Sequence, residues 1–177
     1  MIILKKTIYF SDIIGTIIGS DKNIEEDYDK FNELLKAIKE KDGSDEIIFS
    51  LISTDDEEMV RKVQSMIRPY IDDTVTFGRQ YFDKGFYTDD SEVIDKVTSK
   101  ANHILDYLNL LLDSNDEIVS IYYADDVEMY HVMLNHLIDK GLADRLHCIV
   151  PVRNAGLSET NQLLEDDLKK SNEKAYV

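Results

Sequence analysis

Carboxylates stand directly after two apolar runs of the chain, and they are the side chains best suited to carry out chemistry. Asp12 follows the run 8–11 and precedes a break at Gly15-Thr16, while Asp125 and Asp126 follow the run 118–124. An ionised carboxylate can attack an electrophile, transfer a proton or bind a hard cation such as Mg²⁺. These three acids are therefore the first candidates for a functional site.

Hydroxyl and ammonium groups occupy comparable places. Ser53 and Thr54 end another apolar run, and Lys100 lies in the helical pattern that precedes the run 118–123. Donors of this kind can bind phosphoryl oxygens and neutralise their charge. Thr54 also opens the segment Thr54-Asp55-Asp56-Glu57, a capping box that explains it as a helix N-cap, so Ser53 is the preferred phosphate ligand. Two alternatives to a functional role stay open: Asp126 caps a helix and nothing more, and Lys100 is a solvated residue on a helix face.

The elements that must position these residues are strands that alternate with amphipathic helices, a pattern typical of a parallel α/β sheet. Five strands are predicted, at 7–10, 46–52, 74–77, 118–123 and 146–150. The second and fourth are nearly continuous apolar runs, as expected for strands buried on both faces. The carboxyl ends of parallel strands meet at one edge of the sheet, so we expect Asp12, Ser53 and Asp125 to lie together there.

The segment IYFSDIIGTII, residues 8–18, resembles motif I of the haloacid dehalogenase-like (HAD) phosphohydrolase superfamily, four apolar residues followed by D-x-D-G-T. Asp12 matches the first Asp, and Ile14 replaces the second. Three further sites resemble the later HAD motifs in the same chain order. They are Ser53 or Thr54 after strand two, Lys100 before strand four, and Asp125-Asp126 after strand four. The resemblance covers roughly residues 7 to 150.

The resemblance implies a three-layer, Rossmann-like (HAD-like) α/β domain with a five-stranded parallel sheet in the order 5-4-1-2-3. It also implies that Asp12 attacks phosphorus to form an aspartyl-phosphate, which makes the chain a magnesium-dependent phosphohydrolase acting on a phosphorylated substrate. The Mg²⁺ ion would be held by Asp12, by the backbone carbonyl of Ile14 and by Asp125 or Asp126.

The same resemblance assigns the phosphoryl oxygens to the hydroxyl of Ser53 or Thr54 and to the ammonium of Lys100. Lys96 and Lys84 are alternatives for the lysine.

The replacement at Ile14 bears directly on catalysis. HAD phosphatases use the second Asp to protonate the leaving oxygen and then to activate water, and help of this kind is worth about 10²–10⁴-fold. We therefore expect slow hydrolysis of ordinary phosphate monoesters. The alternative function is a catalytically inactive HAD-fold protein whose acidic surface binds a protein partner.

Charge excludes some partners. The chain has 36 acidic and 20 basic residues and a net charge of −16, which repels nucleic acids and anionic membranes. The only cysteine, Cys148, lies in the apolar run LHCIV and is predicted to be a small core residue, which agrees with a reducing, cytoplasmic setting. No apolar run approaches the roughly 20 residues of a membrane span.

The organisation predicted for residues 1–177 is a single HAD-like domain. The intervals between the predicted strands leave no room for a large cap domain. The HAD resemblance then implies either a large substrate or a site that a partner subunit or a second copy closes. The fourth helix is predicted from Asp126 to Gly141, and residues 165–177 are predicted to form a short helix that frays into a charged tail.

Overall fold

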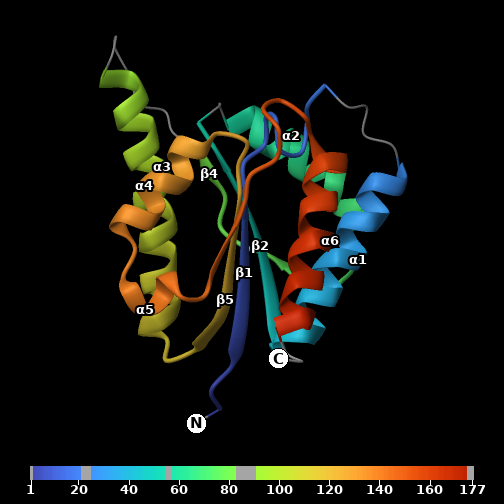
Figure 1. Ribbon diagram of the computed structural model, residues 1–177, viewed down its shortest axis with the longest axis vertical. Coiled ribbons are helices and arrows are strands. Elements are labelled where there is room, and N and C mark those ends of the chain that lie inside the picture. The colour runs from blue at the N-terminus through green and yellow to red at the C-terminus, as the bar shows by residue number, and fades with distance from the viewer. Residues whose placement is uncertain (1, 21–24, 55–56, 83–90, 175–177) are drawn as a thin grey trace.

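The computed structural model describes residues 2–20, 25–54, 57–82 and 91–174, which form a three-layer α/β fold (Figure 1). The strands are β1 (Lys5–Ser11), β2 (Glu46–Ser53), β3 (Val75–Phe77), β4 (Tyr81–Phe82), β5 (Glu117–Ala124) and β6 (Leu146–Ile149). The helices are α1 (Glu25–Asp42), α2 (Glu57–Ile67), α3 (Ser91–Asp113), α4 (Glu128–Leu137), α5 (Lys140–Ala143) and α6 (Leu157–Lys174), with a 3₁₀ turn η1 (Arg68–Tyr70) after α2.

The sheet is parallel in every pairing, in the order β3-β2-β1-β5-β6. This confirms the predicted order 5-4-1-2-3, with the strand that precedes Asp12 at the centre. The two-residue strand β4, which pairs with the end of β2, is an addition to the prediction. It is too short to show a sequence pattern.

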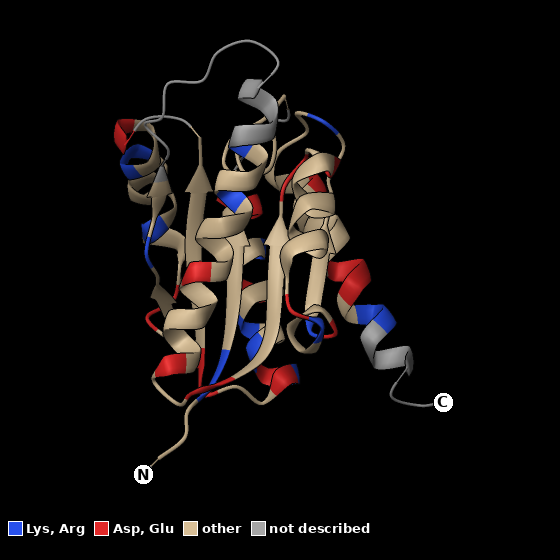
Figure 2. Ribbon diagram, turned by 90° about the vertical axis from the view of Figure 1, so that its left-hand side faces the viewer, with Lys and Arg blue, Asp and Glu red and all other residues tan. Residues whose placement is uncertain are grey.

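Helices cover both faces of the sheet (Figure 1). On one face, Tyr9 of β1 belongs to a core shared with α1, α2 and α6. On the other, Ile8 and Phe10 belong to a core shared with α3, α4 and α5. Successive side chains of β1 point to opposite faces of the sheet, and both sets can be apolar because helices cover both faces. Figure 2 shows the consequence for charge: the upper parts of the central strands carry none, and acidic and basic residues lie mainly on helices and loops.

The prediction for Cys148 is wrong, because its side chain is exposed. The run LHCIV does form strand β6, but among the described strands β6 is the last in the sheet order and pairs on one side alone. An apolar run indicates a strand, and it does not reveal that the strand lies at an edge of the sheet.

Two helices differ from their predicted bounds. The predicted helix from Asp126 to Gly141 is divided, because α4 ends at Leu137 where Ile138 adopts an extended conformation, and Gly141 lies within the separate short helix α5. The C-terminal helix begins at Leu157 and runs to Lys174, so residues 165–174 are its second half. The predicted capping box contains Asp55 and Asp56, which lie outside the described residues.

Among the described residues, no helix has both the length and the apolar character that crossing a membrane requires.

Candidate functional site

The register of the central strands brings two of the candidate acids together. Ser11, the last residue of β1, lies opposite Ala124 at the end of β5, so Asp12 and Asp125 leave the sheet at the same level. The N–H of Asp12 donates to the carbonyl of Ala124 at 2.9 Å, which fixes this alignment. β2 ends beside them, with Leu51 opposite Ser11. Parallel pairing therefore places Asp12, Asp125 and Ser53 at one edge of the sheet, as predicted.

Lys100 joins the two acids. Its Nζ donates to Asp12 Oδ1 at 2.9 Å and to Asp125 Oδ2 at 3.0 Å, and it lies 4.1 Å from the centre of the Tyr130 ring. The residue is only 2% exposed, which contradicts the alternative that it is a solvated residue on a helix face. Burial would lower the pKa of Lys100, but the charges of Asp12 and Asp125 outweigh burial and raise it, so the side chain is an ammonium.

Asp12 is buried and has few hydrogen-bond donors. From the described residues, its Oδ2 accepts only a long hydrogen bond, 3.3 Å, from the hydroxyl of Thr16. Burial raises the pKa of Asp12 to about 7, and the neighbouring charges of Asp125 and Asp126 add to this effect while Lys100 opposes it. Burial thus disfavours the ionised form of Asp12, and a cation bound beside it would stabilise that form.

Asp125 is held from several directions. Its Oδ2 accepts the hydroxyl of Tyr123 at 2.5 Å in addition to Lys100, and its Oδ1 accepts the N–H of Val127 at 3.0 Å. Its backbone carbonyl accepts a hydrogen bond from Nε2 of the buried His131 at 2.8 Å. Both carboxylate oxygens are therefore engaged by protein donors.

Asp126 is held by the loop that follows β6. Its Oδ2 accepts the N–H of Asn154 at 2.8 Å, and its own N–H donates to the hydroxyl of Thr16 at 3.2 Å. Gly15, at φ +90°, lies so close that a Cβ at this position would collide with the Asp126 carboxylate. Only glycine fits here, for reasons of both backbone conformation and space. Asp126 does not cap α4, whose N-cap is Val127 and has no side-chain hydrogen bond.

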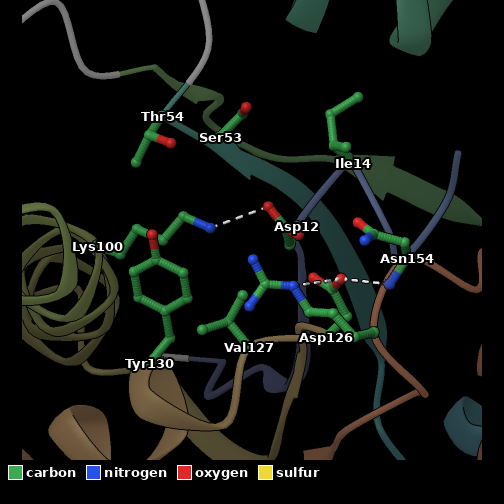
Figure 3. A pocket seen from close by; sticks show the side chains of 10 residues that line it. Asp12, Ile14, Ser53, Thr54, Lys100, Asp126, Val127, Tyr130 and Asn154 are labelled. Carbon is green, nitrogen blue, oxygen red and sulfur yellow. Dashed lines mark hydrogen bonds and ion pairs between the residues drawn. The ribbon is translucent and has the colours of Figure 1, made fainter. Parts of the chain in front are cut away.

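Asp12, Lys100 and Asp126 face a pocket of about 230 Å³ (Figure 3). Its lining consists of Asp12, Ile14, Ser53, Thr54, Lys100, Asp126, Val127, Tyr130, Arg153 and Asn154. The Ile14 side chain is 42% exposed although it is apolar. Ser53 is only 1% exposed and Thr54 is half-buried, and both residues line the pocket, so either hydroxyl stays a candidate phosphate ligand.

Every site residue predicted from the sequence belongs to this region, and Asp125 lies directly behind the lining through its bond to Lys100. Of the alternative lysines, Lys96 is not among the lining residues, and Lys84 lies outside the described residues.

Sequence reasoning missed Tyr130, Arg153 and Asn154, together with Tyr123 and His131 behind the pocket. One signal could have indicated two of them. The segment after the fifth predicted strand, at 151–156, also leaves the carboxyl edge of the sheet, where loops converge. Tyr130 and His131 lie on α4, and only helix packing brings them to the site.

The donor set suits a hard divalent cation. One carboxylate oxygen from each of Asp12, Asp125 and Asp126 can be chosen so that all three lie within 4.8 Å of one another. When ionised, these three acids carry more negative charge than Lys100 can balance. Because Asp12 and Asp126 line the pocket and Asp125 lies behind its lining, Asp12 and Asp126 are the better placed ligands. Oxygen donors of this kind favour Mg²⁺ or Ca²⁺ over softer metals.

Comparison of the sequence with models of protein families and with curated proteins finds no match. The class of the protein is therefore defined by its fold and site. It is an α/β protein of Rossmann-like type with a buried carboxylate–lysine cluster at the carboxyl edge of its sheet.

Proposed function

We propose that this protein is a magnesium-dependent phosphohydrolase of HAD type in which Asp12 is the nucleophile. The observation that carries the proposal is the position of Lys100, buried between Asp12 and Asp125 at the floor of a polar pocket. A buried lysine with two carboxylate partners is costly to build, and such clusters concentrate at functional sites. The segments that resemble the motifs of the family support the proposal, because Asp12, Ser53, Thr54, Lys100 and Asp126 line this same pocket.

The proposed reaction begins with attack of a carboxylate oxygen of Asp12 on phosphorus. The bond from phosphorus to the leaving group breaks, and the aspartyl-phosphate is later hydrolysed by water. Lys100 and the hydroxyl of Ser53 or Thr54 would bind phosphoryl oxygens and neutralise charge that develops in the transition state. Mg²⁺, held by Asp12, Asp126 and the Ile14 carbonyl, would add positive charge beside the transferred group.

Ile14 limits the substrates that such a site can use. It cannot donate a proton to a leaving alkoxide or accept one from water, and this loss costs about 10²–10⁴-fold. An acyl or aryl phosphate, whose leaving group departs without a proton, avoids the first requirement. We therefore propose a good leaving group as the mark of the substrate.

Ile14 also favours a second function. Its apolar side chain is 42% exposed in a pocket that is otherwise largely polar. A binding protein that has lost catalysis tolerates such a residue, and the net charge of −16 would direct it to a basic protein partner. For either function we propose a cytoplasmic setting.

The substitution Ile14→Asp tests the choice between these functions. With Mg²⁺ present, Ile14→Asp should raise hydrolysis of an alkyl phosphate by about 10²-fold or more and change that of acetyl phosphate much less. The control is Ile14→Asn, which has nearly the shape of Asp but cannot transfer the proton. Both variants are first checked for a cooperative melting transition. A folded, metal-binding Ile14→Asp protein that is inactive on both substrates would contradict the phosphohydrolase proposal and favour the binding protein.

A further inference from the structure

Lys100, the inner cation of the pocket, has little capacity left for a ligand. An ammonium has three N–H donors, and two of those on Nζ are engaged by Asp12 and Asp125. The ring of Tyr130 covers the same nitrogen at 4.1 Å. Lys100 can therefore serve one phosphoryl oxygen, and any other anionic group of a ligand must be bound elsewhere.

Arg153 is the second cation of the pocket lining, and its side chain is 67% exposed. Its Nε lies 3.6 Å from Asp126 Oδ2, which is beyond the usual range of a hydrogen bond. The same oxygen already accepts the N–H of Asn154 at 2.8 Å. The Asp126 side chain is buried, but the guanidinium of Arg153 is exposed to water, which screens its charge. Within the described part of the chain, the two terminal nitrogens of Arg153 have no hydrogen-bond or ion-pair partner.

The backbone that carries Arg153 is firmly held, although its side chain is not. The N–H of Asn154 binds Asp126, and its carbonyl accepts the N–H of Ser20 at 2.7 Å. The N–H of Gly156 donates to the carbonyl of Gly15 at 3.0 Å. These bonds tie the loop after β6 to the loop after β1. The backbone of Arg153 thus belongs to a firmly bonded turn, from which its guanidinium contributes to the pocket lining.

We propose that Arg153 binds a second anionic group, a carboxylate or a phosphate, of a ligand whose first phosphoryl group lies at Asp12 and Lys100. This inference rests on the proposed function, because it assumes that the inner site takes a phosphoryl group. Lys100 contacts Asp12 and Asp125, whereas Arg153 contacts Asp126, so the two cations pair with different acids of the cluster. Figure 3 shows Lys100, Asp12 and Asp126 around the same pocket. The two cations therefore address different parts of a ligand.

The chemistry of Arg153 and the size of the pocket define the class of ligand. A guanidinium presents a planar fork of N–H donors that binds a carboxylate or a phosphate with two hydrogen bonds. The pocket, at about 230 Å³, is smaller than the range of roughly 300–1,000 Å³ that holds drug-sized ligands. A compact phosphorylated molecule with a second anionic group fits both observations.

Three probes that cannot be hydrolysed at phosphorus test this inference by titration calorimetry in Mg²⁺ at constant ionic strength. Methylphosphonate has one anionic group, phosphonoacetate adds a carboxylate, and methylenediphosphonate adds a second phosphonate. They are titrated into the wild-type protein and into Arg153→Gln. The matched control is Arg61→Gln, which removes the same charge from an exposed arginine of α2.

We expect at least one two-anion probe to bind the wild-type protein about tenfold or more tightly than methylphosphonate. Arg153→Gln should abolish this advantage and leave methylphosphonate binding unchanged, and Arg61→Gln should leave both unchanged. The tighter of the two probes identifies the second group as a carboxylate or a phosphate.

Two results would overturn the inference alone. They are equal binding of all three probes to the wild-type protein, and an advantage that survives in Arg153→Gln, in either case with methylphosphonate still bound. If none of the probes binds, both this inference and the phosphohydrolase proposal are overturned, because the inner site then takes no phosphoryl group.

Discussion

Lys100→Met removes the charge that joins Asp12 to Asp125 and keeps a side chain of similar length. Both carboxylates are then left in a buried site without their shared partner, since Lys100 is 2% exposed and lies 2.9 and 3.0 Å from their oxygens. Removing one partner of a buried ion pair costs about 3–5 kcal/mol. We expect a loss in the free energy of unfolding within this range, equivalent to a fall of roughly 6–20 °C in the melting temperature of a chain of this size.

Urea denaturation at pH 7.5 without metal measures this loss. The control is Lys36→Met, because Lys36 pairs with Asp72 at the surface, and exposed pairs contribute about 0–1 kcal/mol. Adding Asp125→Asn to Lys100→Met should recover part of the loss, since one uncompensated charge is removed. A loss below about 1 kcal/mol for Lys100→Met would refute the claim that this lysine neutralises a buried cluster.

Two further variants probe the acids around Lys100. The folded state raises the pKa of Asp12 from its usual 3.8 to about 7, so the contribution of Asp12 to stability is greatest below pH 4 and falls as pH rises towards 7. Asp12→Asn has no such proton to lose, so it should be more stable than the wild-type protein at pH 7.5, by up to about 4 kcal/mol in urea denaturation. It should also lose any Mg²⁺-induced rise in melting temperature. If stability depended on pH in the same way in both proteins, the argument that burial raises the pKa of Asp12 would be contradicted. Gly15→Ala should cost more than the roughly 1–3 kcal/mol of backbone strain and should weaken the Mg²⁺ response, because its Cβ displaces the Asp126 carboxylate. Gly43→Ala, at φ +64° with open space around it, isolates the strain alone, and equal costs for the two variants would exclude the collision.

The sheet and the inner acids could be predicted from the sequence because they depend on local patterns. Apolar runs identify strands, and the convergence of parallel strand ends then places Asp12 beside Asp125 whatever the helices do. The predicted strand order followed from the family resemblance rather than from the patterns. A pattern that fits two structures does not decide between them. Cys148 lies in a run that suits a buried strand equally well as an edge strand.

The outer part of the site depends on packing that no local pattern encodes. Tyr130 reaches Lys100 because α4 packs beside α3 on one face of the sheet. Asn154 reaches Asp126 because the loop after β6 is bonded to the loop after β1, more than 130 residues earlier in the chain. Arg153 is placed at the pocket by the same loop. Such contacts join distant segments, so a single sequence gives no periodic signal for them.

The central claim is that Asp12 is a nucleophile towards phosphorus, and intact mass spectrometry after brief incubation with acetyl phosphate and Mg²⁺ tests it most directly. Because Ile14 cannot activate water for the second step, the aspartyl-phosphate should persist long enough to be detected. We predict the mass increase of a single phosphoryl group, located on Asp12, released by hydroxylamine and absent from Asp12→Asn. Absence of this adduct from the wild-type protein, or an equal adduct in Asp12→Asn, would contradict the account.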